Sequence, residues 1–155
     1  MKVFIKTYGC QMNERDSENL AAQLKARGHQ IAESEREADV FVANTCSVRE
    51  AAEQKALGKL SRIAYKKKNG FPIIGVMGCM SQNKGGEIVK AVPRIDFIAG
   101  PRKTPYVADY IEEIARRRKA GIIPPDAPKG ERKKWKYNDA MWSFPREAPH
   151  RPSPP

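Results

Sequence analysis

Short apolar segments without polar alternation recur along the first hundred residues. They comprise residues 3–5, 40–43, 73–77 and 97–99. Apolar runs of this length indicate strands that are buried on both faces, as in a parallel sheet covered by helices. Residues 29–32 predict one further short strand. The pattern therefore predicts a sheet of four or five strands.

Segments with helical spacing lie between these strands. Their apolar residues fall on single stripes, which predicts amphipathic helices that cover the sheet. The first helix is expected to end near Gly28, which suits the position just after a helix. Alternating strands and helices predict an α/β fold, with an open, mostly parallel sheet and helices on both faces. The stripes are Leu20, Ala21 and Leu24; Ala56, Leu57, Leu60, Ile63 and Ala64; and Val107, Tyr110, Ile111, Ile114 and Ala115.

Capping patterns mark where the helices are expected to begin. A serine followed three residues later by Glu50 forms the capping-box pattern. A threonine directly before Pro105 is typical of an N-cap with proline at the first helical position. The predicted N-caps are Asn13 or Asp16, Ser47, and Thr104.

Composition divides the chain near Gly121. The 155 residues include 29 Lys+Arg and 18 Asp+Glu, for a net charge of +11, and most of the 12 prolines lie between Pro124 and Pro155. A basic, proline-rich segment buries little apolar surface. We therefore expect a folded domain over residues 1–118 and a basic, disordered tail over residues 119–155.

The lengths of the apolar segments also bear on the cellular location of the protein. None approaches the roughly 20 residues that a membrane-spanning helix needs, and residues 1–6 lack a signal-peptide pattern. We expect a cytoplasmic protein without a membrane partner. In a reducing compartment, an odd count of three cysteines argues against a disulfide framework.

The three cysteines, Cys10, Cys46 and Cys79, recur at intervals of 36 and 33 residues. Each follows a predicted strand and precedes a predicted helix, which places it at the carboxyl edge of the sheet, where open α/β folds bind ligands. Neighbouring strands lie about 4.8 Å apart, so loops from nearby strand ends can bring the thiols together.

Spacing alone leaves two interpretations of the cysteines open. They could be small buried apolar residues, or they could bind a metal or an iron–sulfur cluster. A structural zinc site needs four protein ligands, and the one histidine of the domain, His29, is expected at the other end of a helix. A three-cysteine cluster would leave one iron open to a non-protein ligand. Neither GxGxxG nor GxxxxGK[ST] occurs, so nucleotide binding has no support.

The segments around the cysteines resemble the N-terminal domain of the radical-SAM methylthiotransferases. The matching segments are residues 7–18 (TYGCQMNERDSE), residues 39–42 (DVFV), residues 44–50 (NTCSVRE) and residues 78–79 (GC). The resemblance covers residues 1–115. With Gln11 after the first cysteine, the sequence is similar to the family branch that modifies N6-isopentenyladenosine beside the tRNA anticodon. Other branches carry lysine or proline-lysine at this position.

This resemblance implies a cofactor and partners. It implies that Cys10, Cys46 and Cys79 hold an auxiliary [4Fe–4S] cluster whose free iron carries the sulfur. It places Asn13, Asn44 and Arg49 around that cluster, although the two asparagines could equally serve helix capping or strand-end turns. The complete enzymes use S-adenosylmethionine, a second cluster on a CxxxCxxC loop of a radical-SAM barrel, a C-terminal RNA-binding domain and the tRNA anticodon stem-loop. No CxxxCxxC occurs in this sequence.

Two other functions remain as alternatives. A non-catalytic iron–sulfur or RNA-associating module would use the basic residues 116–119 and the basic and aromatic residues 132–137, which can contact phosphates and stack on bases. An ordinary α/β domain with buried cysteines would bind no cofactor. The sequence gives no indication of the oligomeric state.

Overall fold

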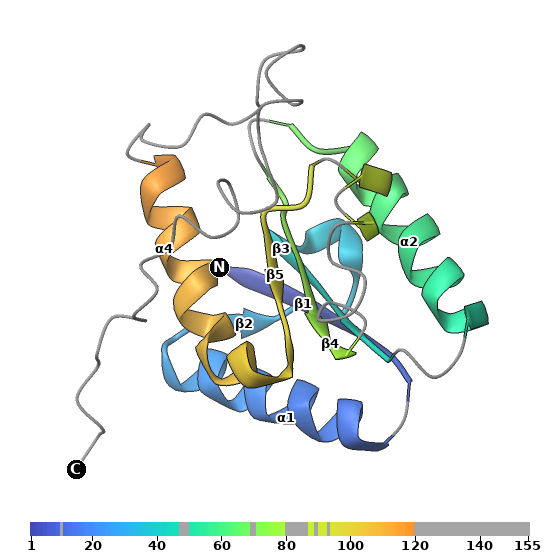
Figure 1. The fold of residues 1–155 in the computed structure, drawn as a ribbon. Helices are drawn as coiled ribbons and strands as arrows, with labels where there is room; N and C mark the ends of the chain where they lie inside the picture. The colour runs from blue at the N-terminus through green and yellow to red at the C-terminus, as the bar shows by residue number, and fades with distance from the viewer. Residues whose placement is uncertain are drawn as a thin grey trace.

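A five-stranded parallel sheet forms the centre of the computed structural model, which describes residues 1–9, 11–46, 50–68, 71–79, 87–88, 90–92 and 94–119. The strand order is β2-β1-β3-β4-β5, and all neighbouring pairs are parallel (Figure 1). This confirms the predicted α/β fold, including the short strand within residues 29–32. The strands are β1 (Lys2–Tyr8), β2 (Gln30–Ile31), β3 (Val40–Thr45), β4 (Ile73–Gly78) and β5 (Phe97–Ala99).

Helices cover both faces of the sheet, as the stripes predict. Helices α1 (Gln11–Ala26) and α4 (Val107–Lys119) lie on one face, and α2 (Glu50–Tyr65) lies on the other (Figure 1). Every residue of β3 and β4 is buried between these two layers, which explains why these strands are apolar without alternation. Two short 3-10 helices, η1 (Glu35–Glu37) and η2 (Pro101–Tyr106), precede β3 and α4.

The helix starts differ from two of the predictions. Helix α1 begins at Gln11, so Asn13 and Asp16 lie inside it and neither is its N-cap. The last helical segment begins as η2 after Gly100, so Thr104 lies within the 3-10 turns. The α-helix α4 itself begins at Val107, because Thr104 and Pro105 lie in the tighter 3-10 turns before it. The predicted cap at Ser47 lies outside the described residues.

The predicted end of the first helix is confirmed, because Gly28 follows α1 with a φ of +84°. Helix α4 extends to Lys119, and residues 120–155 of the predicted tail lie outside the described residues. Within the described ranges, no helix combines the length and apolar character needed to cross a membrane.

Candidate functional site

The carboxyl ends of β1, β3 and β4 form the edge from which the cysteines emerge. Tyr8 is the register partner of Thr45, which is in turn the partner of Gly78. Cys46 and Cys79 directly follow two of these partnered residues, so the predicted common edge is confirmed for both. Cys10 lies outside the described residues, but the preceding Gly9 is described. The strand order reverses between β1 and β3, which is where open α/β sheets bind ligands.

The two described cysteines differ in exposure. Cys46 is 7% exposed, whereas Cys79 is exposed at the surface. Neither forms a disulfide. One thiol is therefore buried and the other accessible at the same edge of the sheet.

The positions directly before Cys10 and Cys79 require glycine, because atoms of neighbouring segments approach them closely. Gly9 has a φ of +145° and Gly78 a φ of +105°, which other residues rarely adopt. A Cβ atom at Gly9 would lie 2.5 Å from Cβ of Cys46 and 3.0 Å from Oδ1 of Asn13. A Cβ atom at Gly78 would lie 3.0 Å from Oδ1 of Asn44 and would collide with the carbonyl oxygen of Thr45. Both glycines therefore allow backbone segments to meet at this edge.

Two buried amides join α1 to β3 beneath this edge. Nδ2 of Asn13 donates to Oδ1 of Asn44 at 2.9 Å and to the carbonyl oxygen of Thr45 at 3.0 Å. Nδ2 of Asn44 donates to the carbonyl oxygen of Asn13 at 2.6 Å and to Oγ of Ser17 at 2.9 Å. Asn13 is 5% exposed and Asn44 is fully buried. The side chains bridge separate elements, so the alternatives of helix capping and a local turn do not describe them.

Hydroxyl groups extend this amide pair, and sequence reasoning missed them. Oγ of Ser17 lies 2.8 Å from Oγ1 of Thr7 on β1, and Oγ1 of Thr45 donates to the carbonyl oxygen of Met77 on β4 at 3.1 Å. A signal for Ser17 was present, because it follows Asn13 by four residues and therefore lies on the same face of α1. Arg49, the other residue expected near the cysteines, lies outside the described residues.

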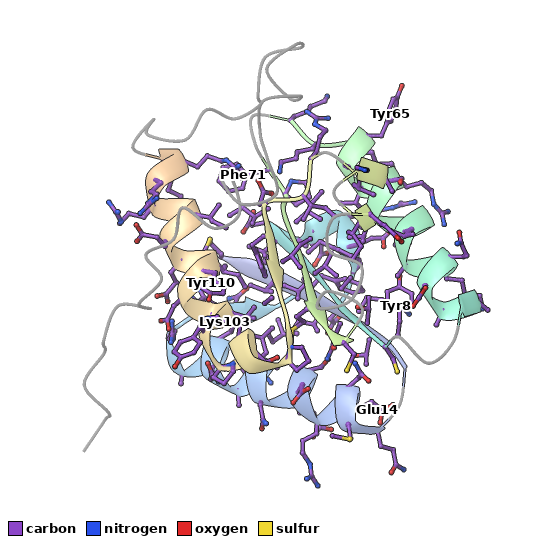
Figure 2. All side chains as sticks on the ribbon, in the orientation of Figure 1. Tyr8, Glu14, Tyr65, Phe71, Lys103 and Tyr110 are labelled. Carbon is purple, nitrogen blue, oxygen red and sulfur yellow. The ribbon has the colours of Figure 1, made fainter. Side chains whose placement is uncertain are left out.

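Tyr8 is the aromatic residue at this edge. Figure 2 shows Tyr8 and Glu14 at one end of the sheet and Phe71 at the opposite end. Burial raises the pKa of the Tyr8 phenol, and the nearby Glu35 carboxylate raises it further. Glu35 is itself paired with Lys59. The phenol therefore stays protonated at neutral pH.

His29 lies away from the cysteine edge, as predicted. It precedes β2, at the amino end of the sheet, and its ring nitrogens lie 3.3 Å from the amino group of Met1 and 3.0 Å from Oε1 of Glu112. The ring is held by these contacts at the opposite end of the strands. A zinc site of three cysteines and His29 is therefore incompatible with the fold.

The basic run at the end of α4 serves contacts within the chain. Arg116 and Arg117 both donate to Glu113, and Arg118 donates to Asp96 at 2.7 Å. These pairs partly neutralise the run, so it offers less charge to a nucleic acid than its sequence suggests.

Thiols are the donors that iron–sulfur clusters prefer. Two thiols follow register-paired strand ends, and Gly9 brings the segment before Cys10 against Cys46. Among the described residues, which do not include Cys10, no three His, Cys, Asp or Glu side chains form a metal-binding group. The two described thiols are donors of the kind that an iron–sulfur cluster requires, and Cys10 lies outside the described residues.

Comparison with known proteins identifies the family. Residues 2–100 match the family described as "Uncharacterized protein family UPF0004". The chain belongs to this family. The matched residues of this UPF0004 chain include all three cysteines and the strands that carry them.

Several relatives of the UPF0004 chain carry the name tRNA-2-methylthio-N(6)-dimethylallyladenosine synthase. The protein of Opitutus terrae is 48% identical over 122 residues, which are 78% of this chain and 25% of the relative. The protein of Akkermansia muciniphila is 46% identical over 118 residues, which are 76% of this chain and 26% of the relative. The chain thus spans about a quarter of the length of these relatives. The resemblance to methylthiotransferases seen in the cysteine segments is confirmed.

Proposed function

We propose that this chain is the auxiliary [4Fe–4S] domain of a tRNA methylthiotransferase. The reaction adds a methylthio group to C2 of N6-isopentenyladenosine next to the anticodon. The observation that carries the proposal is the register of Thr45 with Gly78, from which Cys46 and Cys79 continue at one edge of the sheet, next to the switch point between β1 and β3. The names of the relatives supply the reaction and the substrate class.

In this proposal Cys10, Cys46 and Cys79 hold the cluster. When bound, the cluster supplies an iron with an open position that carries the sulfur to be transferred. We assign Asn13, Asn44 and Arg49 to the surroundings of the cluster, where the two asparagines would orient the backbone that carries the thiols.

The remaining chemistry needs partners. The 155 residues contain three cysteines and no CxxxCxxC, so a second cluster, which cleaves S-adenosylmethionine, must come from a radical-SAM barrel in cis or in trans. The substrate is the tRNA anticodon stem-loop, and the setting is the cytoplasm. A non-catalytic iron–sulfur or RNA-associating module is the alternative function.

Cluster binding is tested by anaerobic reconstitution of the full chain. We expect about four iron atoms per chain in the wild type and a sharp loss of iron in Cys46→Ala, because two thiols retain a cubane cluster poorly. The matched control is Val76→Ala, which truncates another buried side chain, on the neighbouring strand. It should lower stability and leave the iron content of the folded chain unchanged. Equal iron in Cys46→Ala and wild type would refute the ligand assignment.

Activity is tested by nucleoside analysis of hypomodified tRNA incubated with the reconstituted chain, reductant and S-adenosylmethionine. We expect no methylthio product and no 5′-deoxyadenosine from the chain alone. The same assay with a separately supplied barrel tests complementation in trans. Product from the chain alone would show that the radical chemistry does not need another domain.

A further inference from the structure

The residues directly before the three cysteines all lie against the Asn13–Asn44 amide pair. Gly9 approaches Oδ1 of Asn13, and Gly78 approaches Oδ1 of Asn44, since a Cβ atom at either glycine would lie 3.0 Å from that oxygen. The carbonyl oxygen of Thr45 accepts a hydrogen bond from Nδ2 of Asn13. One pair of side chains therefore contacts the backbone from which Cys10, Cys46 and Cys79 each continue.

The amide pair has a single orientation. A carboxamide NH2 group has two hydrogens, and both hydrogens of each asparagine have acceptors within the chain. Rotating either carboxamide by 180° would exchange its oxygen and its NH2 group. The NH2 group would then lie where the oxygen now accepts a hydrogen bond or contacts a glycine. Because the pair is buried, an unpaired donor there would also lose its hydration without compensation.

Ser17 anchors this pair to α1 and β1. Its Oγ accepts from Asn44 and pairs with Oγ1 of Thr7, so the contacts run from β1 through α1 to β3. Thr45 continues the contacts to β4 through the carbonyl oxygen of Met77. The hydrogen bonds thus cross the three strand ends that precede the cysteines.

We propose that Ser17 and Thr7 are positioning residues: through the Asn13–Asn44 pair they fix the spacing of the three cysteine-bearing segments so that the thiols converge on one cluster. This inference rests on the proposed function and adds residues to it. Neither hydroxyl is assigned as a cluster ligand, since both act through the Asn13–Asn44 pair. Groups that orient metal ligands in this way typically change metal affinity by about 10- to 100-fold when removed.

The test compares four variants of the full reconstituted chain. Ser17→Ala removes the anchor, and Ser61→Ala is its matched control, an exposed serine on α2. Thr7→Val removes a hydroxyl without changing the shape of the side chain, and Thr7→Ser restores that hydroxyl. The measurements are the rate of iron loss to a chelator, the EPR spectrum of the reduced cluster, and urea unfolding of the cluster-free chain.

We expect Ser17→Ala to lose iron about tenfold faster with an altered EPR spectrum, and Thr7→Val to show a smaller change in the same direction. Thr7→Ser and Ser61→Ala should match the wild type. A purely structural role would lower the urea midpoint and leave the EPR spectrum unchanged, and that result would overturn the inference. So would iron loss at the wild-type rate in both Ser17→Ala and Thr7→Val.

A cluster-free measurement separates this inference from the proposed function. Phenylarsine oxide binds pairs of nearby thiols, so its affinity for the iron-free chain reports the spacing of the cysteines. We expect weaker binding in Ser17→Ala than in Ser61→Ala. A wild-type chain that binds the arsenical but no iron would refute the cluster, whereas equal arsenical affinity in both variants would refute the positioning role.

Discussion

Asp96→Asn tests how the amino end of the sheet is held together, opposite the cysteines. The Asp96 carboxylate pairs with Lys67 from the chain after α2, and with Arg118 of α4 at 2.7 Å. It also accepts a hydrogen bond from the backbone N–H of Ile74 near the start of β4 at 2.8 Å. One carboxylate therefore connects both helical layers to the sheet.

Replacing the Asp96 carboxylate by a neutral group is costly because its two cationic partners are buried with it. The side chains of Lys67, Asp96 and Arg118 are 2%, 10% and 6% exposed. Asparagine keeps the shape and an acceptor for Ile74, but it removes the negative charge that Lys67 and Arg118 share. Removing one partner of a buried ion pair typically costs about 3–5 kcal/mol, and we expect Asp96→Asn to lower the free energy of unfolding by about that amount.

The same substitution should change the pH dependence of stability. Burial lowers the pKa of Lys67, and the attraction of Asp96 opposes that shift. Without the carboxylate the pKa should fall further. A lysine with a lowered folded pKa destabilises the fold at low pH, and this cost disappears as the pH rises through the folded pKa towards its ordinary value. Asp96→Asn should therefore gain stability with rising pH more steeply than the wild type.

Urea unfolding of the cluster-free chain, followed by circular dichroism between neutral and alkaline pH, measures both effects. The matched control is Glu113→Gln, whose carboxylate also has two cationic partners, Arg116 and Arg117, but lies on the solvent side of α4. Exposed pairs contribute about 1 kcal/mol or less. Equal costs for the two substitutions, or an unchanged pH slope in Asp96→Asn, would refute the argument from burial.

Two glycine substitutions test close packing in β4. In Gly75→Ala the new Cβ atom would meet the ring of Phe97, its register partner on β5, so we expect a loss of about 1–3 kcal/mol in urea unfolding. A Phe97→Leu change that brings no recovery in this background would contradict the clash. Gly78→Ala should cost about 1–3 kcal/mol because of its φ of +105° and the adjacent carbonyl of Thr45, and a thermal melt like that of the wild type would contradict it.

Local sequence patterns determined the elements of this protein. The apolar runs that became β3 and β4 identified buried strands because both faces of these strands meet helices. The position of Cys46 and Cys79 after strands was enough to predict their common edge, since parallel strands end on the same side of a sheet. These inferences needed only the spacing of apolar side chains along the sequence and the right-handedness of strand–helix–strand connections.

The contacts between elements were decided only by the tertiary structure. Asn13 and Asn44 are 31 residues apart, and the sequence allowed each of them a local hydrogen bond instead. Ser17, Lys67 and Asp96 gave no sequence signal strong enough to name their partners. The order of the strands brings each of these residues to its own partner, and that order depends on how the two apolar layers pack against the sheet. In the unfolded chain, water competes for the hydrogen bonds of a polar side chain. Specific hydrogen bonds between such side chains form only where folding buries them away from water.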